Sequence, residues 1–408
     1  MIEIKNKKDC CGCSACVQKC PKDSISLEED YEGFLYPKVN IDTCINCGLC
    51  EKVCPMLHQE DRLSPQEYLA VKNTNEKDRM NSSSGGIFIL LARYIISQGG
   101  VVFGAVFDDN WQLHHVCAET LDEVYPMMGS KYIQSRIENT FNEAEVFLKQ
   151  GRMVLYVGTP CQISGLRHFL HNKEYSNLLL VDILCHGIPS PGVWRSYIGE
   201  TFGAETKLPP LAATGKNTVL LPSLNAMSPI GDIKFRDKQE SGWKKFRFVV
   251  LKKSASKADQ NSVLLSDIHS SNLYMRGFLT NIYLRPSCYT CKCKNGISHS
   301  DFTIGDYWAL KSVDKDFDDD KGASLVLCNT PKGIKLLADL KVTMIKTSFE
   351  KAKMHNGGFD EMVAEPEERK RFFKAFKRKK GFNQSMIYCF EQSLGQRIRR
   401  KVKTFFGK

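Results

Sequence analysis

Residues 151–190 read GRMVLYVGTPCQISGLRHFLHNKEYSNLLLVDILCHGIPS, and this stretch decides the fold class of most of the chain. Residues 153–157 and 178–184 are short apolar runs typical of buried strands, and residues 162–171 between them indicate a helix. A strand, a helix and a second strand in this order form a β-α-β unit, whose two strands run parallel. We therefore expect a mixed α/β domain with a partly parallel sheet.

Two cysteines lie just past the ends of these strands. Cys161 follows the first strand and Cys185 follows the second. The carboxyl ends of parallel strands meet at one edge of a sheet, and open α/β sheets bind their ligands there. We therefore expect both thiols at the same edge.

Three further cysteines, Cys288, Cys291 and Cys293, are crowded into six positions. A thiolate site usually has four ligands. In one interpretation Cys161 and Cys185 join Cys288 and Cys291 to hold a cubane iron–sulfur cluster, and Cys293 is a spare thiol or replaces one of the last two. In the other, the first pair are small buried residues and the later group binds zinc or nothing.

The N-terminus carries a duplicated cysteine run. The pattern C-x2-C-x2-C-x3-C-P occurs at residues 10–21 and again at residues 44–55. Such runs hold two cubane clusters, each bound by three thiolates of one run and the last thiolate of the other. Two structural zinc sites are the alternative, but zinc does not require two adjacent runs with a trailing proline. The expected ligands are Cys10, Cys13, Cys16 and Cys54 for the first cluster and Cys20, Cys44, Cys47 and Cys50 for the second.

Residues 1 to about 60 therefore resemble a bacterial two-cluster ferredoxin. Gly12 and Gly48 would let each loop approach its cluster closely. Residues 24–42 between the runs suit a hairpin. Cys11 lies inside the first gap and remains a spare, packed thiol.

A run of small residues, Ser82 to Gly86, precedes a buried helix expected over residues 87–97 and a strand over residues 101–107. Hydroxyl and glycine residues at a helix N-terminus favour an anion site, because free N–H groups and the helix dipole point there. The phosphate or pyrophosphate of a flavin would fit such a site. Ordinary N-capping by one serine is the alternative.

Composition and charge limit the class of protein. The chain has 408 residues, of which 42% are hydrophobic and 25% charged, as in globular proteins of two or three domains. The start has no apolar segment typical of a signal peptide, and the longest apolar stretch, residues 85–107, is interrupted by Arg93, Gln98 and two glycines. The seventeen cysteines are spaced like metal ligands, so we expect a reducing, cytoplasmic location.

The net charge of +11 is concentrated at the C-terminus. Residues 369–408 hold fourteen Lys or Arg and one acid, so the rest of the chain sums to about −2. The spacing of Ile398, Val402, Phe405 and Phe406 predicts an amphipathic basic helix. Such a helix could lie on an anionic membrane surface, contact an acidic partner protein, or be solvated. Nucleic acid is not expected, because no recognition motif accompanies the charge.

The chain from about residue 65 to 320 is similar to the family of beta subunits of coenzyme F420 hydrogenases and dehydrogenases. Six motifs in the same order carry the resemblance. They are SSSGG at 82–86, GSKYIQS at 129–135, GTPCQISGLR at 158–167, CHGIPSP at 185–191, CYTC at 288–291 and SDFTIGDYW at 300–308.

This resemblance implies an FAD-containing oxidoreductase with an iron–sulfur cluster beside the flavin. The cluster ligands implied are the four cysteines 161, 185, 288 and 291. Two stretches depart from the family pattern: CYTCKC, which leaves the choice between Cys291 and Cys293 open, and residues 204–232, which match no motif. The residues implied to line the flavin are Ser83, Ser84, Gly85, Gly86, Gly129, Ser130, Lys131, Tyr132, Gly158, Thr159 and Pro160.

Three residues are candidates for proton transfer or flavin contact. Lys131 could hold the reduced flavin or a phosphate, His186 could relay protons, and Asp306 could bind a hydroxyl or donate a proton. A structural role is the alternative for Asp306, and a satisfied imidazole near a cluster is the alternative for His186. His114 and His115 are neighbours on an apparent strand and cannot both line one site, so we assign them no role.

The sequence thus predicts a ferredoxin domain over residues 1–60, a flavin and cluster region over residues 65–150 and 151–330, and a basic helical tail over residues 331–408. The predicted function is an iron–sulfur flavoprotein that passes electrons between two [4Fe-4S] clusters, a third cluster, FAD and a small organic two-electron acceptor, such as F420. A redox protein is the expected partner. The rival is a non-catalytic subunit that connects a partner enzyme to a ferredoxin pool.

Overall fold

A computed structural model describes residues 1–203, 212–213, 229–253 and 262–390. Most of the unmatched stretch 204–232 and the helix predicted from Ile398 to Phe406 lie outside these residues. No helix within the described ranges is long and apolar enough to cross a membrane.

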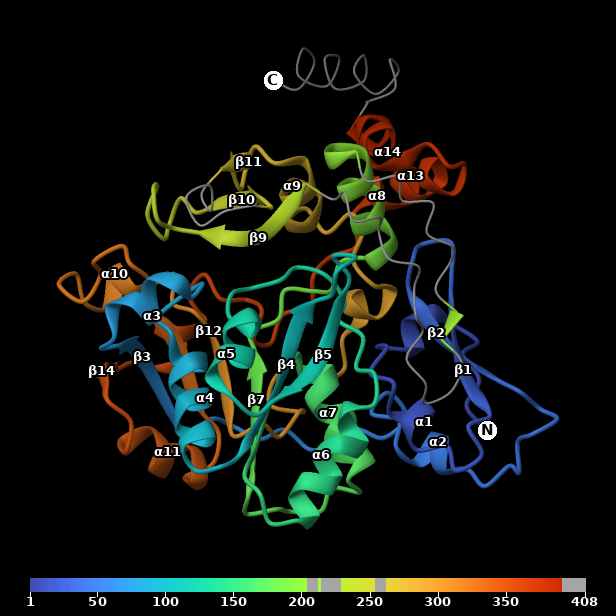
Figure 1. Cartoon of the computed structure of the whole chain (residues 1–408), viewed down its shortest axis with the longest axis horizontal. Coiled ribbons are helices and arrows are strands. Elements are labelled where there is room, and N and C mark those ends of the chain that lie inside the picture. Colours follow the sequence, from blue (N-terminus) through green and yellow to red (C-terminus); the bar gives the residue numbers. More distant parts are fainter. Residues whose placement is uncertain (204–211, 214–228, 254–261, 391–408) are drawn as a thin grey trace, which may run out of the picture.

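The largest unit is an eight-stranded mixed sheet (Figure 1). Its central strands β12, β7, β6 and β4 are parallel, and the outer pairings are antiparallel. This confirms the predicted α/β class with a partly parallel sheet. In spatial order the strands are β14 (Val342–Lys346), β3 (Glu67–Asn73), β13 (Ser324–Cys328), β12 (Phe302–Asp306), β7 (Leu178–Ile183), β6 (Val154–Gly158), β4 (Val101–Phe107) and β5 (Leu113–Ala118).

The β-α-β unit read from residues 151–190 is present as β6, α7 (Pro160–Phe169) and β7. The helix begins two residues earlier than expected. Thr159 is its N-cap and forms a capping box with Gln162, with Pro160 in the first turn. Cys161 therefore lies in the first turn of a helix and not in the loop before it.

Helices cover both faces of the sheet. On one face α4 (Ile87–Ser97) packs Leu91 and Ile95 against strands β4, β6 and β7. On the other face α6 (Thr140–Lys149) and α7 pack Phe141 and Leu166 against the same strands. Burial on both sides explains why these strands read as continuous apolar runs. The helix and strand expected over residues 87–97 and 101–107 are found with these bounds.

The ferredoxin unit lies against the α6 and α7 side of the sheet (Figure 1). It contains η1 (Lys7–Asp9), α1 (Ala15–Gln18), α2 (Leu49–Lys52) and the predicted hairpin of β1 (Ile25–Glu29) and β2 (Leu35–Val39), to which β8 (Ala212–Ala213) adds a third strand. The contact is close. A Cβ atom at Gly165 of α7 would lie 2.7 Å from the Cβ atom of Cys13.

A second, three-stranded sheet lies over the carboxyl edge of the main sheet (Figure 1). We call it the lid sheet; it consists of β9 (Ile230–Asp237), β10 (Arg247–Lys252) and β11 (Val263–Ile268). Trp194 of α8 (Pro191–Phe202) and Tyr274 of α9 (Leu273–Leu279) join Phe235 and Phe248 of this sheet in one aromatic core.

Residues 331–390 differ from the expected basic tail. Strand β14 pairs with β3 in the main sheet, and Phe372 and Phe382 are fully buried in the aromatic core. The expected boundary at residue 331 is therefore wrong: the aromatic face of the first basic segment packs inside the protein and is not free to meet a membrane. The helices of this region are α11 (Pro331–Ala338), α12 (Phe349–Lys353), α13 (Glu367–Lys377) and α14 (Gly381–Phe390).

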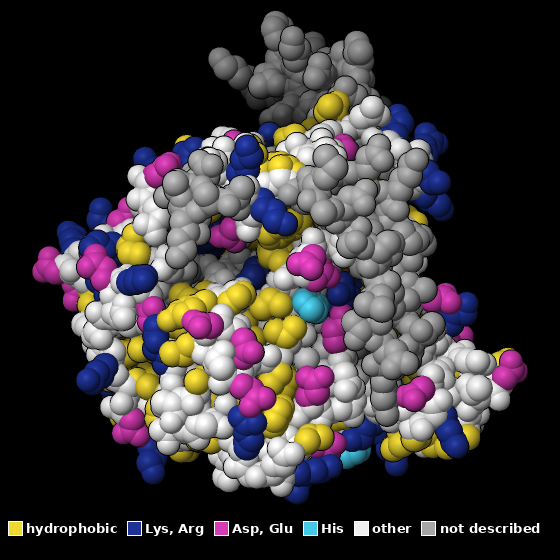
Figure 2. Space-filling view, viewed as in Figure 1, with side chains coloured by type: hydrophobic (Ala, Val, Ile, Leu, Met, Phe, Trp, Pro, Cys, Tyr) yellow, Lys and Arg dark blue, Asp and Glu magenta, His cyan; other side chains and the backbone are white. Residues whose placement is uncertain are grey.

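The remaining short helices lie in connections. They are α3 (Glu76–Asn81), α5 (Leu121–Val124), η2 (Tyr125–Met127), η4 (Pro286–Thr290) and α10 (Leu310–Val313). On the face shown in Figure 2, basic and acidic side chains are interspersed over the body, in agreement with the near-zero charge counted for residues 1–368.

Candidate functional site

A cavity of about 820 Å³ lies between the carboxyl edge of the main sheet and the lid sheet. Parallel strands direct the residues that follow them to this edge, and the lid sheet closes the opposite side. The residues from the sequence prediction that line it are Ser83, Ser84, Gly86, Gly129, Ser130, Lys131, Tyr132, Gly158, Thr159, Cys185, His186 and Asp306.

Two residues expected to line the flavin are not part of the cavity wall. Pro160 is buried in the first turn of α7, and Gly85 packs against the strands behind the wall. A Cβ atom at Gly85 would lie 2.2 Å from the Val71 carbonyl oxygen and 2.4 Å from the Ser324 nitrogen. Gly85 is therefore required for close backbone packing, and it does not line the cavity.

The first turn of α4 faces the cavity without a side-chain cap. Gly86 is its N-cap, with a φ of +83°, and no side chain accepts from the first-turn N–H groups. Ser84 Oγ instead donates to the Ala323 carbonyl at 2.6 Å, and Ser83 Oγ accepts from the Ser130 N–H at 2.6 Å. The alternative of serine N-capping is thus wrong. The helix end keeps its donors for another acceptor.

Two lysines beside this helix end are already bonded. Lys131 Nζ donates to the carbonyl oxygens of Met127 and Met128 at 3.1 and 3.0 Å, and burial lowers the pKa of Lys131 to about 8. Lys238 Nζ donates to the Ser84 carbonyl at 2.8 Å, and burial lowers the pKa of Lys238 to about 7. Both ammonium groups thus hold loops in place, a role that the sequence did not predict for Lys131.

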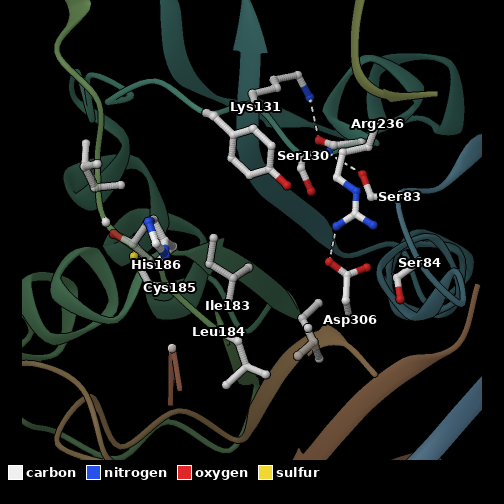
Figure 3. Close-up of a pocket in the computed structure, with 18 of the residues that line it drawn as sticks. Ser83, Ser84, Ser130, Lys131, Ile183, Leu184, Cys185, His186, Arg236 and Asp306 are labelled. Atoms are coloured by element: carbon white, nitrogen blue, oxygen red, sulfur yellow. Dashed lines mark hydrogen bonds and ion pairs between the residues drawn. The ribbon is translucent and has the colours of Figure 1, made fainter. Parts of the chain in front are cut away.

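Asp306 accepts hydrogen bonds from Arg236 and, at 3.2 Å, from Trp243 Nε1 (Figure 3). Sequence reasoning missed Arg236. Its side chain is 2% exposed and lies over the Phe246 and Trp308 rings at 4.3 and 4.9 Å. Asp306 thus orients a buried cation, the structural alternative considered for it.

The alternation of polar and apolar residues along β9 could not predict that Arg236 is buried. The pairing of β9 with β10 shifts register between Lys234 and Asp237, and this shift buries both Phe235 and Arg236. In a regular strand, neighbours face opposite sides, so one of the two would be exposed.

Two histidines at the cavity are neutral. His186 Nε2 bonds to Asn281 Oδ1 at 2.6 Å, and burial lowers the pKa of His186. His115 bonds to Ser135 Oγ at 2.7 Å and to the Val157 carbonyl at 3.0 Å, and burial lowers its pKa to about 4. As expected from strand alternation, only one of the neighbouring pair, His115, lines the cavity.

Four thiols gather beside the cavity, at the end nearer the ferredoxin unit. Cys161 lies in the first turn of α7, Cys185 follows β7, Cys288 lies in η4 and Cys291 caps it. Burial is the main cause that raises the pKa of Cys185, and the nearby thiols of the other three cysteines raise it further. Cys185 also lines the cavity, so the group of four cysteines extends to the cavity wall.

Cys293 is 1% exposed and neighbours the thiols of Cys11, Cys161 and Cys291. Cys291 lies near enough to Cys185 to raise the pKa of that thiol. This arrangement favours Cys291 as the fourth member of the group. Cys11, expected to be a spare thiol, packs from the ferredoxin unit against this group.

The duplicated cysteines of the ferredoxin unit form two groups. Cys20, Cys44, Cys47 and Cys50 line one small cavity. Backbone N–H groups donate to the sulfur of Cys20, Cys44 and Cys50 at 3.3 to 3.4 Å. The second group comprises Cys10, Cys13, Cys16 and Cys54, which neighbour one another. Among the described residues, no three His, Cys, Asp or Glu side chains lie close enough together to hold a single metal ion.

Two parts of the chain match known families. Residues 151–352 match the family described as the C terminus of the coenzyme F420 hydrogenase/dehydrogenase beta subunit, and residues 9–57 match a 4Fe-4S dicluster domain. The second match identifies the N-terminal runs as [4Fe-4S] ligands and removes the zinc alternative there.

Similar proteins come from several organisms. The F subunit of the F(420)H(2) dehydrogenase of Methanosarcina mazei is 24% identical over 197 residues, which cover 45% of this chain and 55% of that protein. The coenzyme F420-dependent sulfite reductase of Methanocaldococcus jannaschii is 26% identical over 170 residues, 40% of this chain and 26% of that protein. The chain thus spans about half of the first relative and a quarter of the second.

A solved structure is also similar. It is a chain of the F420-reducing [NiFe] hydrogenase complex from Methanosarcina barkeri, with 16% identity, a TM-score of 0.44, and coverage of 85% of this chain and 96% of that chain. On the family matches, this iron–sulfur protein belongs through residues 151–352 to the family of coenzyme F420 hydrogenase/dehydrogenase beta subunits and carries a 4Fe-4S dicluster ferredoxin domain at its N-terminus.

Proposed function

We propose that this protein is an FAD-dependent iron–sulfur oxidoreductase that exchanges electrons between its ferredoxin clusters and a small organic two-electron acceptor. A third [4Fe-4S] cluster on Cys161, Cys185, Cys288 and Cys291 would connect the two. The observation that carries the proposal is the position of these thiols. They lie between the ferredoxin unit, through Cys11, and the cavity wall, through Cys185.

The contacts of the ferredoxin unit support an order of electron transfer. The second-cluster thiols lie at the outer side, where Cys47 is exposed. The first-cluster thiols lie inward, with Cys13 against Gly165 of α7 and Cys10 against Arg285. An electron would therefore pass from the second cluster to the first, then to the third, and then to the cavity. The reverse direction uses the same route.

The cavity suits a flavin in size and in the chemistry of its ends. Its volume is in the range of cofactor sites. One end has the uncapped first turn of α4 and Arg236, which suit phosphate groups, and the other end has Cys185 and the apolar side chains of Ile183 and Leu184 (Figure 3). When bound, FAD would exchange single electrons with a cluster and pairs with an organic molecule.

The residues of the chain position and shield the reacting groups. His186 stays neutral and is fixed by Asn281 and the edge of the Phe278 ring. Lys294, which is 7% exposed and donates to the Glu361 carbonyl at 2.8 Å, places a positive charge near Cys185. A cation at this place would stabilise the reduced, more negative form of a cluster. The loop of residues 355–363 and the lid sheet line the side of the cavity that faces the main sheet.

The acceptor is proposed by similarity. Two relatives are named for F420, so we propose an F420-like deazaflavin as the first acceptor to test. A non-catalytic electron-transfer subunit is the second candidate, because one relative is named as a subunit and matched over half its length.

A single experiment separates the two candidates. Anaerobically purified protein should contain FAD, and after reduction with dithionite its flavin absorbance should return when F420 or another small acceptor is added. An electron-transfer subunit would be reoxidised by partner proteins and by no small organic acceptor. Purification without any flavin, combined with failure to bind added FAD, would overturn the proposal.

A further inference from the structure

Arg236 is a buried cation with unused hydrogen-bonding capacity. Its side chain is 2% exposed and lines the cavity. Nη1 donates to Asp306, whereas Nε and Nη2 have no hydrogen-bond partner among the described residues. Leaving such donors buried and unpaired is costly, so buried guanidinium groups normally meet an acceptor.

The guanidinium is held in one orientation. Asp306 binds it from one side and is itself fixed by Trp243, and the rings of Phe246 and Trp308 lie against it. The Tyr132 hydroxyl also lies beside the guanidinium and interacts with it, so it limits the orientation of the group further. A planar, preoriented fork of donors is suited to two-point binding of an oxyanion.

The uncapped end of α4 faces the same part of the cavity. Figure 3 places Arg236 beside Ser83, Ser84 and Ser130, and Gly86, Ile87 and Phe88 line the adjoining wall. The other nearby cations, Lys131 and Lys238, donate to backbone carbonyl oxygens. The donors available to a ligand are therefore the first-turn N–H groups of α4 and the free side of Arg236.

We propose that Arg236 and the first turn of α4 form a two-sided phosphate site, in which the lid sheet and the main domain bind the same phosphate group. The proposal rests on the proposed function, because the phosphate would belong either to the flavin or to a phosphate-bearing acceptor. Phosphate matches the site because its several oxygens can accept from a helix N-terminus and from an arginine at once. Since Arg236 comes from β9, such a ligand would also join the lid sheet to the body.

Binding measurements on the clusters-intact protein test the site. The variants are Arg236→Gln and Arg236→Lys, and the matched control is Arg247→Gln on β10, whose guanidinium bonds to Ser266 and does not line the cavity. Flavin is removed anaerobically, iron content is checked, and the affinities for FAD, FMN and riboflavin are measured by fluorescence quenching. Riboflavin has no phosphate, so its affinity measures the contribution of the parts of the flavin other than the phosphate.

If the phosphate is the flavin's, Arg236→Gln should weaken FAD and FMN binding by roughly ten- to a hundredfold, the weight of charge-assisted hydrogen bonds. Riboflavin affinity should change little, Arg236→Lys should be intermediate, and Arg247→Gln should resemble wild type. If the phosphate is the acceptor's, flavin binding is unchanged, and the dissociation constant of F420 rises while that of phosphate-free 5-deazariboflavin does not.

Unchanged affinity of Arg236→Gln for every phosphate-bearing molecule, or an equal loss for riboflavin, overturns the phosphate site and leaves the proposed function standing. A wild-type protein that binds neither flavins nor deazaflavins overturns both.

Discussion

Arg285 Nη2 lies 3.4 Å from Cys10 Sγ, and Arg285 Nε donates to the Cys10 carbonyl at 2.7 Å. The guanidinium is 1% exposed, and no carboxylate pairs with it among the described residues. Cys288 follows three positions later, so one residue joins the loop of the first ferredoxin cluster to the loop of the third thiol group. A buried cation with no acidic partner suits a place between centres whose reduction adds negative charge.

Removing this cation should shift a reduction potential. In Arg285→Gln the first ferredoxin cluster should become harder to reduce by about 60 mV, the one-electron equivalent of a tenfold change in equilibrium constant. Redox titration followed by EPR would measure the shift, with the exposed Arg276→Gln as the control. Equal potentials in both variants, with full iron content, would show that Arg285 serves packing alone.

The thiol group beside the cavity predicts an iron count. Cys161→Ser or Cys185→Ser should lower iron by about four atoms per chain, the content of one cubane, because serine is a poor ligand for iron–sulfur clusters. Iron analysis and EPR on anaerobic protein would measure it. Cys293→Ser is the matched control and should keep the full content. Loss of iron in Cys293→Ser and not in Cys291→Ser would assign the fourth ligand the other way.

The ferredoxin unit is attached to α13 by a buried ion pair between Glu32 and Arg369. Glu32→Gln would leave the Arg369 charge uncompensated, so the free energy of unfolding should fall by about 3 kcal/mol. Anaerobic urea unfolding followed by circular dichroism would measure the loss. The double variant Glu32→Gln with Arg369→Met should recover most of it, since no buried charge then remains. A single variant as stable as wild type would contradict this assignment.

His115 predicts a pH dependence of stability. Burial lowers its pKa to about 4 from 6.5, so the folded protein binds fewer protons than the unfolded chain between these values. This contribution is fully present above pH 6.5 and is lost as pH falls toward 4. Between pH 7.5 and 5.5 wild type should lose about 1 kcal/mol more than His115→Gln. Parallel unfolding curves for both proteins at the two pH values would show that His115 does not titrate in this way.

Strong local patterns in the sequence predicted much of this structure. The strand, helix and strand around Cys161 follow from apolar runs of characteristic length, and the helix over residues 87–97 was found with the same bounds. The duplicated cysteine runs fixed the ferredoxin domain because their spacing is itself the chemistry of a cluster. These features depend on residues close together in the chain, so they can be read without knowing the fold.

Other features depended on partners distant in sequence. The first basic segment has the pattern of a surface helix, yet Phe372 packs in the aromatic core and Arg369 meets Glu32, 337 positions earlier. Gly85 and Gly86 are neighbours in one motif, but only Gly86 reaches the cavity. A pattern of apolar or small residues in a sequence does not identify which part of the chain will pack against them.

By itself, the sequence determined the α/β class, the ferredoxin domain and the edge of the sheet at which the site lies, because periodicity and ligand spacing are local properties of the chain. The tertiary structure alone decided that Lys131 is held by carbonyl oxygens while Arg236 faces the cavity with free donors. Which cation is free depends on the backbone oxygens that folding brings within about 3 Å of it, and those oxygens belong to every residue type alike.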